Sequence, residues 1–312
     1  IALNNLKLRA SWGRLGNENA LGYYDFLALI STYNTKYQGY VKGNGDNAWA
    51  GSIARGLENR SLKWETTDTK NIGLDFGFFN NKLTGAMNYY YNQTEELLIT
   101  KALPPSAGLN NPILNVGKIR NSGVEVEINW ADSKGGFDYN IGMNFSTTKN
   151  KVVELADKGQ VLYGEGLKYG TEHFPTQTRV GKPIGAFYLY KTNGLFQSNE
   201  EARQYVNADG DEYQPFADAG DIRYVDVNGD GYIDDDDKVY CGSGIPTLEV
   251  NLNFSAGYKG FDLSVVLGSA WGHKIYNGNK YFYEGMNSGS NFLTSSLNVW
   301  TPQNTNTNIP RA

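Results

Sequence analysis

The chain has 312 residues, of which 40% are hydrophobic, 20% charged and 13% aromatic, and tyrosine is the commonest aromatic residue with 22 copies. This balance excludes a disordered polypeptide, and the longest apolar run, around residues 26–30, is too short for a transmembrane helix. The net charge of −5, from 28 basic and 33 acidic residues, leaves no basic surplus of the kind that nucleic-acid binding requires.

The first predicted element is a strand close to the amino-terminal end of the chain. Leu6, Leu8, Ala10 and Trp12 alternate there with polar residues, as they do when successive side chains point to opposite faces of a sheet. No adjacent run pairs with this strand, so we expect it to be unpaired. Because Ile1 begins almost inside the run, we also expect both ends of a longer precursor to be missing.

Three hairpins with the same alternation follow along the chain. Their arms are residues 71–79 and 83–92, 123–130 and 137–146, and 248–258 and 261–267. The predicted turns lie at Asn80-Asn81, at residues 132–136 and at Lys259-Gly260. In each arm one face carries Leu, Ile, Val, Phe, Met or Trp, and the other carries mostly Gly, Asn, Asp, Glu, Ser or Thr.

The length and spacing of these strands favour a transmembrane barrel over a soluble sandwich. The turns within hairpins take a few residues, whereas the connections between hairpins run from about 98 to 113 and from about 150 to 245. Aromatic residues collect at strand ends, as in a membrane-interface girdle. They are Phe78, Phe79, Tyr89, Tyr90, Tyr91, Trp130, Phe137, Tyr258, Phe261 and Trp271. The predicted fold class is an all-β, antiparallel transmembrane β-barrel, present as a fragment with long extracellular loops.

Six of the acidic residues fall in the segment 226–237, with the sequence DVNGDGYIDDDD. Its oxygen-bearing positions have the spacing of a calcium loop, in which alternate residues wrap one cation and a glycine permits a sharp turn. The predicted ligands are Asp226, Asn228, Asp230, Tyr232 through its carbonyl, Asp234 and Asp237. We expect Ca²⁺ ahead of Mg²⁺, because a flexible oxygen-rich loop suits the larger ion. A solvated turn with no metal is the alternative.

Several segments together resemble the SusC/RagA family of TonB-dependent outer-membrane transporters. The most specific are 220–237, 242–246, 253–264 and Trp271-Gly272, with support from 8–17, 62–67, 120–125, 180–185 and 300–302. The resemblance implies that residues 1–312 belong to one barrel domain, with 194–244 as a long loop insertion. It places the plug domain, the TonB-contacting box and the closing strands outside this chain.

The same resemblance implies a function for the full protein in the cell outer membrane. That function is import of oligosaccharides, or of peptides in some relatives, beneath a SusD-like surface lipoprotein and with energy supplied through TonB. From the residues alone, the alternative is a secreted calcium-stabilised β-sandwich that binds carbohydrate.

No catalytic or cofactor-binding residues are predicted, so the chain is not expected to be an enzyme. Glu125 and Glu127 share a strand face, but no nucleophile or oriented base accompanies them, and His173 and His273 lack ligands at metal spacing. Aromatic side chains on long loops are candidates for stacking on sugar rings, although packing of each loop is the simpler role. They are Tyr33, Tyr37, Trp49, Tyr163, Tyr169, Phe187 and Tyr188.

Overall fold

The described part of the protein forms two compact units. A computed structural model describes residues 3–18, 21–32, 52–54, 56–101, 103, 105–164, 166–169, 171–284 and 291–311. The first unit comprises residues 1–160, 179–183 and 246–272, and the second comprises 161–178, 184–245 and 273–312. The segment 194–244, expected from the sequence as a loop insertion, lies within the second unit.

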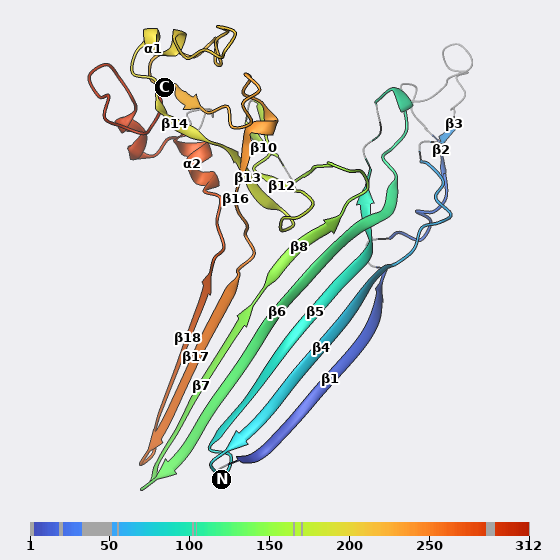
Figure 1. The fold of residues 1–312 in the computed structure, drawn as a ribbon, viewed down its shortest axis with the longest axis vertical. Coiled ribbons are helices and arrows are strands. Elements are labelled where there is room, and N and C mark those ends of the chain that lie inside the picture. The colour runs from blue at the N-terminus through green and yellow to red at the C-terminus, as the bar shows by residue number, and fades with distance from the viewer. Residues whose placement is uncertain are drawn as a thin grey trace, which may run out of the picture. The chain divides into compact units, whose positions relative to one another are not determined.

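One antiparallel sheet makes up most of the first unit. Its strands lie side by side in the order β1-β4-β5-β6-β7-β17-β18, and β8 pairs with the far end of β6 (Figure 1). The strands are β1 (Leu3–Asn17), β4 (Glu65–Phe78), β5 (Leu83–Thr100), β6 (Ile113–Lys134), β7 (Phe137–Thr147), β8 (Lys149–Glu154), β17 (Leu248–Tyr258) and β18 (Phe261–Trp271). A separate two-stranded sheet joins β2 (Ile30–Thr32) to β3 (Ser52–Ala54).

All three predicted hairpins are confirmed by the pairing register. β6 and β7 meet at Lys134 and Phe137, and β17 and β18 meet at Tyr258 and Phe261, so each connection is two residues long. The connecting residues Gly135, Gly136, Lys259 and Gly260 all have positive φ, as tight turns between twisted strands require. The β4–β5 connection is longer, because Phe78 pairs with Leu83, and Phe79, Asn80 and Asn81 all adopt positive φ.

The prediction that the first strand is unpaired is wrong. β1 pairs antiparallel with β4 along nearly its whole length, from Leu3 opposite Phe78 to Asn17 opposite Glu65. The sequence did not reveal this partner because about fifty residues separate the two strands, and alternation within a strand carries no information on a distant neighbour.

Two strands extend further than their alternation indicated. β5 has 18 residues and β6 has 22, so that only residues 101–112 connect them. Residues 125–134 of β6 pair with β7, and residues 118–122 pair with β8. The change of partner lies at Gly123. A Cβ atom at Gly123 would collide with the carbonyl oxygen of Thr147, so this approach of the two backbones requires glycine.

The second unit consists of short elements and turns. Its strands are β9 (Leu162–Tyr163), β10 (Leu167–Tyr169), β11 (Thr171–His173), β12 (Thr176–Thr178), β13 (Ala186–Tyr190), β14 (Thr192–Leu195), β15 (Ile222–Tyr224) and β16 (Lys238–Gly242). The helices are α1 (Asn199–Arg203) and α2 (Gly278–Tyr283), with 3₁₀ turns at Asp235–Asp237 and Thr294–Asn298, and the first unit has another 3₁₀ turn at Pro105–Ala107. The largest sheet of the second unit has the order β16-β13-β12-β9.

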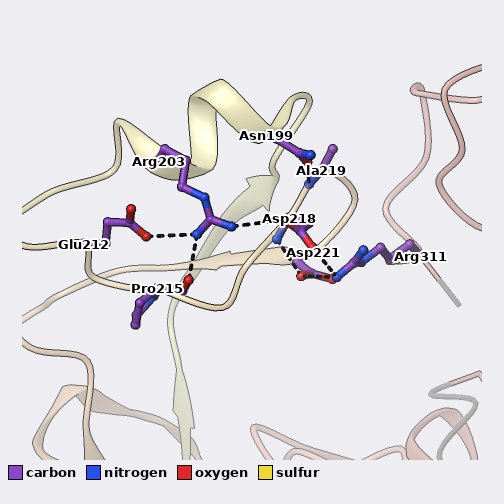
Figure 2. A network of polar contacts seen from close by, with 8 residues as sticks. All are labelled: Asn199, Arg203, Glu212, Pro215, Asp218, Ala219, Asp221 and Arg311. Atoms are coloured by element: carbon purple, nitrogen blue, oxygen red, sulfur yellow. Dashed lines mark hydrogen bonds and ion pairs between the residues drawn. The ribbon is translucent and has the colours of Figure 1, made fainter.

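A small apolar core and a polar network hold part of the second unit together. Phe196, Ala202 and Ala217 are buried, and Tyr205 packs against them. Figure 2 shows Arg203 contacting Glu212 and Asp218, while Arg311, more than ninety residues along the chain, contacts Asp218 and Asp221. The Arg311 Nε–Asp221 Oδ1 distance is 2.7 Å.

The same region depends on one glycine. The backbone N–H of Gly220 donates to the carbonyl of Phe196 at 2.7 Å, and the N–H of Arg311 donates to the carbonyl of Gly220 at 3.0 Å. Gly220 has a φ of +92°, and a Cβ atom there would lie 2.5 Å from the Trp300 ring. The segment around residue 311 is therefore fixed to the core by ion pairs, by the Trp300 ring and by backbone bonds.

Candidate functional site

The register of the main sheet places the alternating side chains on two distinct faces. Directly paired residues share a face, so the row of Leu8, Leu74, Met87 and Val126 crosses four strands on one side. On β7 and β17 the same face continues through Phe145 and Val250. The neighbouring row of Arg9, Gly73 and Asn88 belongs to the opposite face. The two faces predicted from the sequence are confirmed.

The apolar face has no covering layer within the described chain. Leu8 is 76% exposed, Trp12 67%, Ile72 60% and Phe261 82%. In water, such a continuous apolar surface would be unstable, whereas acyl chains would cover it. The described residues contain no helix long and apolar enough to cross a membrane.

Aromatic rings border the apolar face at the end with short turns. Phe79 lies 6.1 Å from Trp130 between ring centroids, and Phe137 lies 6.3 Å from Tyr258. At the other end, Tyr89 and Tyr91 belong to this face, but Tyr90 does not, because it pairs with Gly123 on the polar side and its hydroxyl donates to the Thr147 carbonyl. The inclusion of Tyr90 in the predicted girdle is therefore wrong.

The polar face carries a bidentate ion pair. Arg9 donates from Nε and Nη2 to the carboxylate of Asp75, with an Nη2–Oδ1 distance of 2.7 Å, and Nη2 also donates to Asn88 Oδ1 at 2.8 Å. A side chain at Gly73 would occupy the space of this contact, since an added Cβ would lie 2.9 Å from Arg9 Nη2. Glu125 and Glu127 are exposed on the same face, at β6.

The acidic segment 226–237 folds as a loop whose carboxylates turn inward toward its own backbone. The N–H groups of Gly229 and Gly231 donate to the two oxygens of Asp226, at 2.6 and 2.9 Å. Asn228 Oδ1 accepts from the N–H of Asp230, and Asp230 Oδ1 accepts from the N–H of Tyr232. These are the bonds that a loop wrapping toward its centre needs.

Asp237 closes the loop from its far end and is fully buried. Its Oδ1 accepts from the N–H of Val227 at 2.7 Å, and its Oδ2 accepts from the N–H of Asp234 at 2.9 Å. The structure thus brings both ends of the predicted cation loop together. Within the described residues, no group of three or more His, Cys, Asp or Glu side chains is placed to hold a metal ion.

The adjacent Asp235 is held by a lysine and two tyrosines. Lys238 Nζ lies 2.7 Å from Asp235 Oδ1, and the hydroxyls of Tyr190 and Tyr163 donate to the same carboxylate at 3.1 and 3.4 Å. The hydrogen bond from Lys238 lowers the pKa of Asp235 below its ordinary value. Burial, together with the Asp235 carboxylate, raises the pKa of Tyr190. This cluster attaches the acidic loop to β13.

The structure describes only some of the candidate sugar-binding aromatics, and these differ in exposure. Tyr33, Tyr37 and Trp49 lie outside the described residues, and so does the side chain of Tyr169. Tyr188 is only 5% exposed, which agrees with the simpler role of packing and removes it from the candidates for stacking on sugar rings. Tyr163 is exposed beside the ring of Phe174, at 5.4 Å between centroids.

Phe187 is the candidate that lines a cavity. The cavity lies within the second unit, has a volume of about 540 Å³ and is walled mainly by apolar atoms, including those of Leu189, Ile275 and Ile309. The Phe187 ring stacks with that of Tyr276, with centroids 6.4 Å apart. The sequence did not predict this cavity because its walls come from five separated stretches of the chain, and no local pattern joins them.

An antiparallel sheet with one apolar face, one polar face, short turns at one end and aromatic borders defines the class of outer-membrane β-barrel proteins. In agreement, residues 2–268 match the family model described as "TonB dependent receptor-like, beta-barrel". The chain belongs to this family, and the predicted resemblance to SusC/RagA transporters is confirmed. Its members lie in the outer membrane, which gives the location of the chain.

Two curated relatives match along nearly the whole chain. The chain is 31% identical to "TonB-dependent receptor P3" of Formosa agariphila over 98% of its length, and 28% identical to "TonB-dependent receptor SusC" of Bacteroides thetaiotaomicron over 95%. It covers 29% and 27% of those proteins, respectively, so it spans less than a third of each. These relatives are named receptors and not enzymes.

The solved structure of the "RagAB peptide transporter" shares the fold. It superposes with a TM-score of 0.71 over 99% of the chain at 23% identity, and 32% of that transporter chain is covered.

Proposed function

We propose that this chain forms part of the barrel wall of a transporter that imports oligosaccharides or peptides across the outer membrane. The observation that carries the proposal is the two-faced sheet, whose apolar side suits lipid and whose polar side, with Arg9, Asp75 and Asn88, suits a water-filled interior. A soluble sandwich, the alternative from the sequence, would need a second sheet over the apolar face, and the family match disagrees with it.

The energy source and the partner protein that we propose rest on similarity to the relatives. A TonB-dependent transporter draws on the inner-membrane proton-motive force, and a SusD-like surface lipoprotein would cover the extracellular side. Similarity to SusC and to the RagAB transporter supports both assignments. The RagAB structure is named as that of a peptide transporter, and the SusC/RagA resemblance implies oligosaccharide, so these are the two cargo classes to test.

Uptake by cells tests the transport proposal. Cells carrying the full-length gene, a deletion and a complemented deletion would be incubated with fluorescent oligosaccharide and peptide mixtures, with and without a protonophore. We expect uptake of one class that is lost on deletion and abolished by the protonophore. Protonophore-insensitive uptake, or equal uptake by the deletion strain, would contradict the proposal. Pull-down of the tagged transporter tests the lipoprotein partner separately.

We also propose that the 226–237 loop binds Ca²⁺ and thereby stiffens a long external connection. The support is the ligand spacing of Asp226, Asn228, Asp230, Asp234 and Asp237, together with a fold that joins the two ends of the loop. A carboxylate oxygen has two lone pairs, so an aspartate that accepts a backbone N–H can still contact a cation.

Calcium titration with limited proteolysis of residues 221–240 tests this binding. We expect Ca²⁺ to slow cleavage of the full-length protein more than Mg²⁺ does. Asp230→Asn should weaken the protection, whereas Asp209→Asn, an exposed acidic residue outside the loop, should leave it unchanged. A cleavage rate that does not change when Ca²⁺ is added would contradict the proposal.

A further inference from the structure

The lipid-side face of the sheet changes from apolar to charged at the same level on several strands. A row here is a set of residues paired directly across neighbouring strands. The last row that contains aromatic residues consists of Trp12, Lys70, Tyr91, Ser122 and Lys149. The next row on the same face, away from the short turns, consists of Arg14, Asp68, Gln93, Arg120 and Lys151. With Lys118, which contacts Glu95 on the same face, the basic side chains of these rows form what we call the basic belt. Its members are Arg14, Lys70, Lys118, Arg120, Lys149 and Lys151.

The level of the belt matches the boundary of a bilayer. From the short turn, β5 takes nine residues to pass from Leu83 to Tyr91, and β4 takes nine from Phe78 to Lys70. A tilted transmembrane strand needs about 9–11 residues. β6, with 22 residues, then continues well past this level. Long connections lie at this end of the sheet, and in outer-membrane barrels that end is extracellular. The belt therefore lies at the headgroups of the outer leaflet.

The belt carries more positive charge than its own acidic neighbours neutralise. Against six basic side chains stand Asp68, Glu95 and Glu154. Arg14 pairs with Asp68 at 2.6 Å, and Lys118 pairs with Glu95 at 3.1 Å and Glu154 at 3.9 Å. The excess is local, because the whole chain has a net charge of −5.

Four of the cations have no carboxylate partner among the described residues. Lys149 and Lys151 are exposed, and Lys70 and Arg120 lie over the ring of Tyr91 at 5.8 and 5.1 Å. Arg120 donates from Nη2 to Gln93 Oε1 at 3.2 Å, but its buried Nε has no hydrogen-bond partner within the described chain. A guanidinium with an unused donor and two free ammonium groups lie side by side on the belt.

We propose that the basic belt binds the phosphate groups of anionic glycolipids of the lipid A type in the outer leaflet. The Arg120 guanidinium carries a charge that attracts phosphate oxygens, and Lys149 and Lys151 add charge at the edge of a low-dielectric slab, where attraction is strong. Tyr91 and Trp12 lie in the deeper of the two rows, level with Lys149, where rings are stable between headgroups and acyl chains. A proteinaceous partner fits less well, because the belt continues the lipid-side face and not the polar face.

Binding of purified lipid A to the full-length transporter in detergent tests the proposal. The variant is Lys149→Gln with Lys151→Gln. The matched control is Lys134→Gln with Lys259→Gln, which removes two exposed lysines at the short-turn end. We expect at least about tenfold weaker binding of diphosphoryl lipid A by the belt variant, since each lysine near an anionic surface contributes on the order of 1 kcal/mol. The control should match the unmodified protein.

Three results would overturn the proposal. The first is equal affinity of the belt variant and the control for lipid A. The second is that the unmodified protein binds intact lipid A and lipid A stripped of its phosphates equally well. The third is that the belt variant loses a co-purifying lipoprotein while its lipid A binding is unchanged. Heat-modifiable migration of each variant on gels confirms that its barrel is folded. The inference uses the outer-membrane location and not the import activity, so each can fail without the other.

Discussion

The two units of the chain are stabilised in different ways. The main sheet has few buried side chains, among them Val126 and Val152, and leaves most of its apolar residues uncovered by the described protein. The second unit buries Phe196, Ala202 and Ala217 and holds its turns with ion pairs and backbone hydrogen bonds. The sheet therefore depends on lipid for its apolar face, while the second unit depends on its own small core. Substitutions that affect one unit alone can test this difference.

Removal of Phe196, the largest fully buried side chain among the described residues, should have the largest effect. Phe196→Ala leaves a cavity beside Ala202 and Ala217, and we expect a loss of about 3 to 5 kcal/mol in local stability. Limited proteolysis should show faster cleavage within residues 195–225, while heat-modifiable migration of the barrel stays normal. Faster cleavage together with loss of heat-modifiable migration would show that the stabilities of the two units are not independent.

A charge on the lipid-side face should affect the sheet alone. Leu74→Arg should cost about 2 to 4 kcal/mol if Leu74 lies at mid-bilayer, measured by denaturant unfolding in lipid vesicles. Asn71→Arg, on the polar face of the same strand, is the matched control and should be mild. Equal costs for the two variants would contradict the assignment of faces.

Asp75→Asn should lose more stability than Asn71→Arg. The structure shows that Asp75 accepts both donors of Arg9, a bond pair that the amide cannot reproduce. Its cost in the same unfolding experiment should remain below that of Leu74→Arg. A cost no greater than that of Asn71→Arg would mean that the ion pair contributes nothing.

Asp237 is expected to stabilise the acidic loop without any metal. Asp237→Asn keeps the shape but turns an NH₂ group toward a buried backbone N–H, which should cost about 1 to 3 kcal/mol. Asp236→Asn, at an exposed neighbouring position, should cost little. Hydrogen exchange of residues 226–238 in chelator would check both, and equal exchange rates would contradict the role of Asp237.

The smallest expected effect is a pH dependence at Asp235. Because Lys238 lowers the folded-state pKa of Asp235, the stabilisation is fully present above the unfolded pKa of about 4 and is lost as the pH falls through the folded value. Lys238→Met should therefore flatten the dependence of second-unit stability on pH below the unfolded pKa of about 4. Denaturant unfolding at each pH, monitored by the signal of a fluorophore attached to Cys241, measures the stability of the second unit. Lys191→Met is the control. The same slope in Lys238→Met and the unmodified protein would contradict this coupling.

The sequence predicted the sheet far better than the second unit. Alternation around Leu74 or Val126 is a local signal, and tight turns such as Lys259-Gly260 fix the register of each hairpin. The pairing of β1 with β4 and the extension of β6 onto β8 depend on contacts distant in sequence, so alternation could not predict them. Alternation puts Tyr90 on the opposite face from Tyr89 and Tyr91, as the structure does, and only its inclusion among the girdle aromatics, which rested on position along the strand, was wrong.

The candidate site was only partly predictable for the same reason. The spacing of Asp226, Asn228 and Asp230 is local and predicted a wrapped loop, which the structure has. The burial of Tyr188 and the cavity beside Phe187 arise from packing against distant segments, which no short pattern records.

The most direct test of the two-faced sheet is alternate accessibility along β4. Single cysteines at positions 71, 72, 74, 75 and 76 would be introduced into the full-length protein without other cysteines, and labelled in outer membranes with a water-soluble maleimide. We expect labelling of the variants at Asn71 and Asp75 and protection of those at Ile72, Leu74 and Phe76. Labelling of all five positions, or protection of Asn71 and Asp75 with labelling of Leu74, would contradict the two-faced sheet.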